Sequence, residues 1–356
     1  MFLDFQSADQ TQNYCKSVLK KYSTIILYGY SDIGHTHHWI MVALEKALLS
    51  LATKSQSVIM LSKSSEFSEE IFENSIVFGN INQDNPDENM PIIDSADYII
   101  HDHNPGRFES KRERYSKSVK NGRCVFYRVF RKYSGPEDPF ERILNYEAHE
   151  WSRELKMLSI PWATNLLPNE LPKKPAYPVP ENRDVVFVGT IWKPNENQIS
   201  ELAKSCTRHG LRFVHYGKNF SGYKFPDGAN VISSQDYISE EEHQKVISKA
   251  FLAPAIQAIA QIGNNPLNGS YVPCRLLKNV SYLSLPVSNN LYIKPFLGGS
   301  AVVSQDIDEM IRLSMEVADD RKMRESMIGN VYEIIREKHT YISRIATMLQ
   351  ALETSE

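Results

Sequence analysis

Two basic side chains, Arg275 and Lys278, stand three residues apart in the stretch Gly269–Ser288. Apolar side chains recur around them at helical spacing: Leu276, Leu277, Val280 and Leu283. The pattern predicts a loop, a short helix with one buried face, and a strand that begins at Pro286. Residues three apart project from neighbouring positions of a helix, and cations beside free N–H groups at a helix N-terminus can bind a diphosphate. The alternative is an ordinary solvated basic face, because surface Lys and Arg are common.

A diphosphate site needs positive charge that is fixed in place. Arg275 can grip a phosphate through two N–H groups, and Lys278 adds a point charge. A departing nucleoside diphosphate gains negative charge in the transition state, so fixed cations lower the barrier without a metal ion. A second phosphate-facing loop is predicted from three residues that follow an apolar run: Gly189, Thr190 and Lys193. Glycine permits close backbone approach there, although a plain strand–turn–helix corner would have the same pattern.

A hydroxyl that accepts a transferred group must lose its proton to a base. Asp32 and His35 are the candidates, since both stand in the polar segment Ser31–His38 after an apolar run. Histidine has a pKa near neutrality, and an aspartate serves if it reaches the acceptor oxygen. The candidates for binding the rest of the acceptor are His37, His38, His101, His103 and Asn104.

Each of these groups has a plainer interpretation. Asp and His side chains also bind metals, but a metal needs three or four converging ligands, and the His35-x-His37 spacing supplies only a weak signal. We therefore predict no metal site. His35 could instead cap or pack the helix that begins near Trp39. The segment from His101 to Asn104 could be a turn with solvated polar side chains.

Composition excludes several classes of protein. The 356 residues favour about two domains. The fractions of hydrophobic and charged residues, 42% and 23%, are typical of a globular protein. A net charge of −3 shows no basic excess, so no nucleic-acid partner is expected. The four cysteines form no C-x-x-C pair, which argues against a zinc site or a disulfide framework and favours a reducing cytoplasm.

The N-terminal residues lack the basic start and apolar run of a signal peptide, so none is expected. No apolar run is long enough for a membrane span, which needs about 18 residues or more. The expectation is a cytoplasmic protein, with peripheral membrane contact left open.

The first half of the chain alternates between two hydrophobic periods. Apolar runs predict strands at residues 24–30, 57–61, 76–79, 98–101 and 123–129. Helical spacing predicts helices at residues 8–21, 39–51, 107–120 and 140–158. Strands separated by helices indicate an α/β domain with a mostly parallel sheet. Open sheets of this kind bind ligands at the carboxyl ends of their strands, where the polar segments at Asp32 and His101 fall.

Four prolines within nine residues, from Pro172 to Pro180, then predict a semi-rigid linker. The alternation begins again after it, with strands at 184–190, 212–217, 250–256 and 286–288. Helices are predicted at 196–209, 239–249, 307–317, 319–336 and 341–352. The expected domains are an N-terminal Rossmann-like domain (1–170), a linker (171–183), a C-terminal Rossmann-like domain (184–335) and a C-terminal helix (336–356) that packs back on the first domain.

Two such halves resemble the GT-B fold of Leloir-type glycosyltransferases. The resemblance is carried by Val185–Thr190, Leu252–Ile256, Tyr271–Ser288 and the tail His339–Arg344. It implies an α/β protein with two Rossmann-like domains facing each other across a cleft. It also implies an acceptor on the first domain and a GDP-, UDP- or other nucleotide-linked sugar on the second, as co-substrate and with no further cofactor.

The motif departs from that of many retaining members, which carry two glutamates in an E-x7-E pattern. Ser270 and Lys278 stand at those two positions in this chain. Tyr271 and Val272 are similar instead to a Tyr-Val pair in inverting fucosyltransferases. The resemblance therefore favours inversion, with Tyr271 in the donor site and a glycan or glycoconjugate hydroxyl as acceptor.

Two other functions fit the same organisation. A two-lobed protein could close on a small ligand or sugar without catalysis, although such proteins resemble periplasmic binding proteins and usually carry a signal peptide. A nucleotide-sugar epimerase would also bind a nucleoside diphosphate. Stabilisation by a nucleotide would favour either enzyme over the binding protein, and product analysis would separate the two enzymes.

Overall fold

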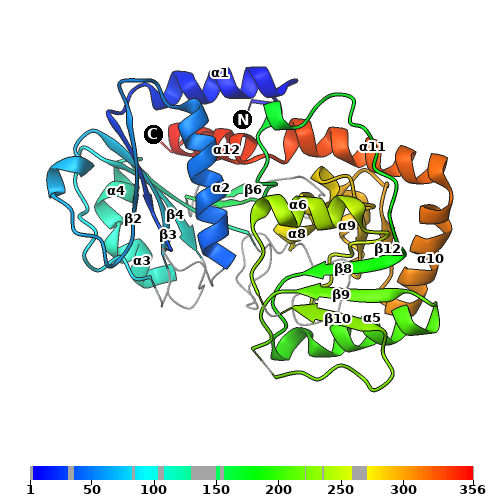
Figure 1. Cartoon of the computed structure of the whole chain (residues 1–356). Coiled ribbons are helices and arrows are strands. Elements are labelled where there is room, and N and C mark those ends of the chain that lie inside the picture. The colour runs from blue at the N-terminus through cyan, green and yellow to red at the C-terminus, as the bar shows by residue number, and fades with distance from the viewer. Residues whose placement is uncertain are drawn as a thin grey trace. The chain divides into compact units, whose positions relative to one another are not determined.

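The computed structural model describes residues 3–30, 36–81, 85–102, 108–129, 150–152, 156–220, 222–234, 236–258 and 271–355. Contacts divide the chain into two compact units, Met1–Pro168 with Glu337–Glu356, and Asn169–Arg336 (Figure 1). Each unit combines parallel strands with helices, so the predicted α/β class is confirmed. Within the described ranges, no helix combines the length and apolar character needed to cross a membrane.

The first unit is built on a seven-stranded sheet in the order β2-β1-β3-β4-β5-β7-β6. Its strands are β1 (Thr24–Tyr28), β2 (Ser57–Leu61), β3 (Ser75–Ile81), β4 (Asp97–Asp102), β5 (Cys124–Arg128), β6 (Glu150–Ser152) and β7 (Met157–Ser159). All neighbours are parallel except β6 and β7. Every residue of β3 and β5 is buried, as expected for central parallel strands that are covered on both faces.

Helices of the first unit are α1 (Ala8–Leu19), α2 (Thr36–Leu51), α3 (Phe108–Arg114), α4 (Ser116–Lys120) and α12 (Tyr341–Glu353), with a 3-10 turn, η1 (Glu69–Phe72). Ser7 begins α1 by accepting the Gln10 N–H, a normal helix N-cap. The predicted helix at 107–120 is divided at Tyr115, which is fully buried in the core with Tyr98 and Phe126.

One prediction for this unit is wrong. Residues 140–158 were predicted as a helix, but residues 150–152 and 157–159 are the strands β6 and β7. The apolar residues Trp151 and Leu158 pair across that antiparallel edge. Short apolar runs do not distinguish a helix from a strand, and here the open edge of β5 decides the outcome by pairing with β7.

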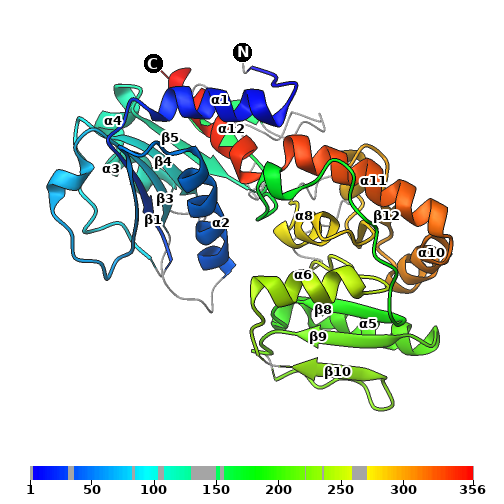
Figure 2. The same ribbon diagram turned by 45° about the horizontal axis from the view of Figure 1, so that its top comes forward.

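The C-terminal helix α12 belongs to the first unit, where it contacts α1, α2 and β5 (Figure 2). Arg344 anchors it, because its guanidinium donates to the carbonyl oxygens of Pro161 (2.8 Å), Trp162 (3.0 Å) and Lys338 (2.8 Å). Burial lowers the pKa of Arg344 to about 9. A buried arginine that serves three carbonyl groups fixes where the last helix lies.

The second unit contains the three-stranded parallel sheet β10-β9-β8 and the parallel pair β11-β12. The strands are β8 (Asp184–Val188), β9 (Arg212–Tyr216), β10 (Val231–Ser234), β11 (Val287–Ser288) and β12 (Val302–Val303). The predicted strand at 250–256 is instead an extended segment with single bridges, Leu252 to Val185 and Ala255 to Ser288. It links the two sets of strands. β10 was not predicted, because two of its four residues are exposed and its sequence has no apolar run.

Its helices are α5 (Glu196–Arg208), α6 (Glu240–Lys249), α8 (Cys274–Ser281), α9 (Ile293–Phe296), α10 (Ile307–Asp319) and α11 (Arg321–Lys338), with 3-10 turns η3 (Pro168–Glu170) and η4 (Lys193–Asn195). The proline-rich segment 171–183 also lies in this unit. Tyr177 packs against its core, and Pro178 accepts a hydrogen bond from Arg324 of α11 (2.9 Å).

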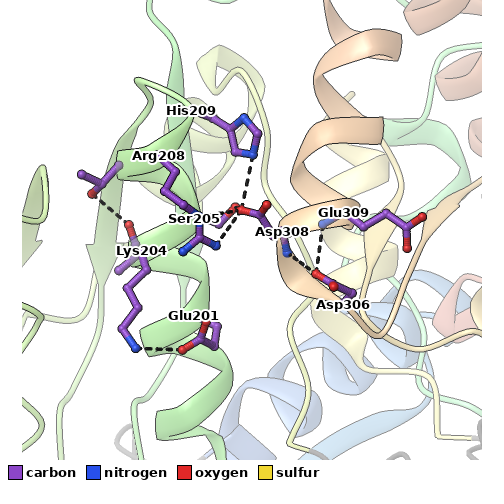
Figure 3. Close-up of polar contacts among 10 residues, drawn as sticks. Glu201, Lys204, Ser205, Arg208, His209, Asp306, Asp308 and Glu309 are labelled. Carbon is purple, nitrogen blue, oxygen red and sulfur yellow. Dashed lines mark hydrogen bonds and ion pairs between the residues drawn. The ribbon is translucent and has the colours of Figure 1, made fainter.

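Helices α5 and α10 are joined by a polar cluster (Figure 3). Asp308 accepts hydrogen bonds from Ser205 (2.7 Å) and Arg208 (2.6 Å), and lies 3.4 Å from His209 Nε2. Asp306 caps α10 by accepting the N–H groups of Asp308 and Glu309. Asp306 and Asp308 have an Asp-x-Asp spacing. Asp306 is used to cap α10, and Asp308 is used in the ion pair with Arg208.

Candidate functional site

Strand β8 ends against the side chain of Arg275, and this junction is the centre of the candidate site. A Cβ atom on Gly189 would lie 2.2 Å from Arg275 Nη2, so only glycine allows this approach. Gly217, after β9, is also tightly packed, because a Cβ there would lie 2.6 Å from the Gly189 carbonyl oxygen. Both glycines stand at the carboxyl ends of parallel strands, where sheets of this kind bind ligands.

Arg275 points inward rather than into solvent. Its Nε donates to the Val188 carbonyl (2.8 Å) and its Nη1 to the Ile256 carbonyl (3.2 Å), while Cζ lies 4.3 Å above the centroid of the Phe187 ring. Burial lowers the pKa of Arg275 from its ordinary value. Nη2 has no hydrogen-bond partner within the described ranges, so one arm of a fixed guanidinium remains available at the Gly189 turn.

Thr190 adds donors next to that arm. Neither its backbone N–H nor its hydroxyl is hydrogen-bonded to any part of the chain that the structure describes, and the residue is partly exposed. The turn itself is fixed, because Asn195 donates to the Thr190 carbonyl (3.1 Å) and the Ile191 N–H donates to Lys218 (2.8 Å). Lys193 of the predicted phosphate-facing loop is highly exposed and pairs with Glu196 (3.1 Å) on the surface.

His215 of β9 contacts the turn at Gly189. Its Nε2 lies 2.8 Å from the Gly189 carbonyl oxygen, and its Nδ1 lies 2.9 Å from the Ser233 hydroxyl. A carbonyl only accepts hydrogen bonds, so Nε2 carries the proton and Nδ1 accepts from Ser233. Burial, and then the Arg275 charge, lower the pKa of His215, which keeps the ring neutral.

Lys278 lies one turn further along α8, is partly exposed, and has no ion-pair partner among the residues described. It acts electrostatically on His243 of α6, a helix that contacts α8 (Figure 2). Burial, then Lys278 and then Arg275, lower the pKa of His243 to about 3. The two cations therefore create a positive region beside His243. Sequence reasoning did not select His243 as a site residue, because it stands alone among the charged residues of α6.

Three buried amide side chains form a hydrogen-bond network beside Tyr271, which precedes α8, and two of them bind the Tyr271 main chain. Gln257 Nε2 and Asn290 Nδ2 donate to the Tyr271 carbonyl at 3.3 and 3.2 Å. The Gln257 backbone exchanges two hydrogen bonds with the side chain of Asn289, both at 2.9 Å. The sequence shows these amide residues directly after predicted strands. Its pattern does not show that their side chains converge at Tyr271.

In the first unit, the structure brings His37 and His101 together. Their Nδ1 atoms lie 3.0 and 3.1 Å from the side-chain oxygen of Asn80, a residue that sequence reasoning missed. His38 turns elsewhere, with its Nδ1 3.1 Å from the Tyr30 carbonyl oxygen. The remaining predicted residues lie outside the described part of the chain: Asp32, His35, His103 and Asn104. Within that part, no three His, Cys, Asp or Glu side chains are placed to hold a metal ion.

Comparisons with known proteins find similarity of overall fold. No protein-family model matches the chain, and no curated protein matches it significantly. Among solved structures, trehalose-6-phosphate synthase (OtsA) is 10% identical, with 91% of this chain and 97% of that chain covered and a TM-score of 0.49. AviGT4, a glycosyltransferase involved in avilamycin A biosynthesis, is 12% identical over 92% and 98% of the chains, with a TM-score of 0.43.

SnogD, a glycosyltransferase from Streptomyces nogalater, is 13% identical over 94% of this chain and 100% of that one, with a TM-score of 0.41. These similarities concern the fold alone. The α/β architecture with parallel strands is shown by the structure itself, in both units.

Proposed function

We propose that this chain is a glycosyltransferase that uses a nucleotide-activated sugar. The observation that supports this most directly is Arg275, whose guanidinium is fixed by two carbonyl groups and leaves Nη2 available beside the open donors of Thr190. Fixed N–H donors at the carboxyl end of a parallel sheet suit a diphosphate. The donor then binds to the second unit, on Gly189, Thr190, Lys193, Tyr271, Arg275 and Lys278.

The reaction in this proposal needs no metal ion. As the bond between the sugar and the diphosphate breaks, the leaving oxygen gains negative charge, which Arg275 Nη2 and Lys278 stabilise. Because the Arg275 guanidinium is held by Val188 and Ile256, it need not reorganise when the charge develops. The absence of an E-x7-E pair, with Ser270 and Lys278 at those positions, supports an inverting rather than a retaining transfer.

The acceptor in this proposal is a hydroxyl of a glycan or glycoconjugate, bound to the first unit. Asp32 or His35 takes its proton, and the acceptor is contacted by His37, His38, His101, His103 and Asn104. The pairing of His37 and His101 through Asn80 supports this placement, because it gathers two of these groups at the carboxyl ends of the sheet strands β3 and β4.

A thermal-shift screen with UDP, GDP and CMP, beside free sugars and amino acids, tests the proposal. We expect one nucleoside diphosphate to raise the melting temperature and Lys278→Ala to reduce that rise. Lys204→Ala is the matched control, since Lys204 pairs with Glu201 on the exposed face of α5. Stabilisation by sugars or amino acids alone would instead identify a binding protein, and isomerised nucleotide sugar without transfer would identify an epimerase.

A further inference from the structure

The position of the Arg275 guanidinium depends on two separate segments of the second unit. Its Nη1 donates to the Ile256 carbonyl (3.2 Å), at the end of the extended segment that bridges to β8 and β11. Its backbone lies in the first turn of α8, shortly after Tyr271. A shift of one segment against the other would therefore change where the guanidinium lies.

Gln257 is bonded to both of these segments. It directly follows Ile256 in the chain, and its side-chain Nε2 donates to the Tyr271 carbonyl (3.3 Å). Its Oε1 accepts from Asn290 Nδ2 (3.1 Å), which also donates to the Tyr271 carbonyl (3.2 Å). A carbonyl oxygen only accepts hydrogen bonds, so the Gln257 amide has a single orientation here. The side chain thus joins the residue after Ile256 to the main chain that leads into α8.

The backbone of Gln257 is fixed as well. Its N–H donates to Asn289 Oδ1 and its carbonyl accepts from Asn289 Nδ2, both at 2.9 Å. Asn289 follows β11, so its amide takes the place of a neighbouring strand just beyond the bridge between Ala255 and Ser288. Gln257, Asn289 and Asn290 are at most 2% exposed. A buried polar network whose members are satisfied in this way is rigid.

A second buried amide joins the same two segments without this connection. Asn279 lies in α8, and its Nδ2 donates to the Ala253 carbonyl (2.8 Å) of the extended segment. It is also 2% exposed. In the described part of the chain, its side chain bonds to neither Ile256 nor Tyr271. Comparison of the two amides therefore separates general packing of α8 from control of the guanidinium.

We propose that Gln257 is a positioning residue that holds the Arg275 guanidinium in place for a diphosphate. This rests on the proposed function, in which Arg275 Nη2 binds a phosphate oxygen of the donor. The polar atoms of Gln257 bond to other residues of the chain, so Gln257 acts on the donor through Arg275. A guanidinium that is held in position before the donor binds need not reorganise when negative charge develops.

Nitrogen-15 NMR of the arginine side chains in the labelled full chain tests the position directly, with Arg275→Ala to assign the signal. The Arg275 Nε–H donates to the Val188 carbonyl, so we expect a resolved signal in the wild type. Gln257→Met, which keeps the size and removes both amide groups, should shift or broaden it, and Asn279→Leu should not. An unchanged signal in Gln257→Met, or the same change in both variants, would overturn the proposal.

Calorimetric titration with inorganic pyrophosphate tests the consequence for binding. Gln257→Met should weaken the affinity by about 10–100-fold, as when a hydrogen bond to a charged group is lost. Asn279→Leu should keep the wild-type affinity, and urea unfolding compares the stability of the two variants. Gln257→Asn, whose shorter amide does not reach the Tyr271 carbonyl, is a second variant that should behave as Gln257→Met does.

The outcomes separate this proposal from the proposed function. If the wild type binds no pyrophosphate, the diphosphate site itself is refuted, and the role of Gln257 with it. If the wild type binds and the Gln257 variants bind equally well, only the positioning role is refuted. Equal losses of affinity in Gln257→Met and Asn279→Leu would likewise show that both amides contribute packing alone.

Discussion

The Nη2 atom of Arg275 lies 2.2 Å from the point where a side chain on Gly189 would begin. This contact joins the end of β8 to the first turn of α8, two segments that are far apart in the sequence. It means that the identity of residue 189 controls where the guanidinium can lie.

Gly189→Ala should displace the Arg275 guanidinium and weaken nucleoside diphosphate binding by about 10–100-fold, the effect of losing a hydrogen bond to a charged group. Calorimetric titration with the nucleotide measures it. Gly210→Ala is the control, because Gly210 also has a positive φ (+66°) but a Cβ there would meet nothing within 4 Å. Equal affinity in both variants would remove Gly189 and Arg275 from the site.

Arg275→Ala and Lys278→Ala should differ in their effect on stability. Loss of the Arg275 side chain leaves the Val188 and Ile256 carbonyls without this hydrogen-bond donor. If no water replaces it, each carbonyl lowers the free energy of unfolding by about 1–3 kcal/mol. Lys278→Ala removes no hydrogen bond and should leave the free energy of unfolding nearly unchanged. Urea unfolding measures both, and similar losses in the two variants would contradict the inward placement of Arg275.

Acid should destabilise the chain through His243. Its pKa lies near 3 in the folded protein, against 6.5 without the fold. The unfolded chain therefore binds the extra proton first, so the stability is complete above pH 6.5 and is lost as the pH falls from 6.5 towards 3. His243→Leu should flatten this part of the curve of unfolding free energy against pH. His209→Leu is the comparison, and an identical slope in wild type and His243→Leu would exclude His243 as the cause.

Asp308→Ala should weaken the contact between α5 and α10 (Figure 3) only modestly. The Asp308 side chain is 45% exposed. Exposed ion pairs contribute about 0.2–1 kcal/mol. Hydrogen bonds from Ser205 and Arg208 lower the pKa of Asp308 below 3.8, so its contribution is complete above that pH and is lost as the pH falls through the folded value. Thermal unfolding at low and high salt checks it, with Asp319→Ala, which breaks the exposed pair with Arg183, as control.

Hydrophobic period alone was enough to predict most of the elements. The spacing of Leu44, Leu48 and Leu51 predicted α2, and the apolar run from Ile25 to Tyr28 predicted β1. These patterns succeed because a helix or strand must bury one face, or both, whatever its neighbours are. The sequence also predicted that the backbone at Gly189 is approached closely by another group. It did not predict that this group is the Arg275 side chain.

Tertiary contacts decided the rest. Part of a predicted helix is the strand β7, because it pairs with the edge of β5. Strand β10 pairs with β9 although its own sequence has no apolar run. The sequence placed Arg275 and Lys278 on one helix with a phosphate-binding composition, but only packing sent Arg275 inward to two carbonyls and left Lys278 partly exposed.

The pairing of His37 with His101 through Asn80 likewise depends on the parallel register of β3 and β4 and on the position of α2. Sequence therefore determined which chemical groups the chain carries and which local elements hold them. Their distances and protonation were set by contacts between residues remote in the chain, because hydrogen bonds and burial depend on neighbours that local periodicity does not specify.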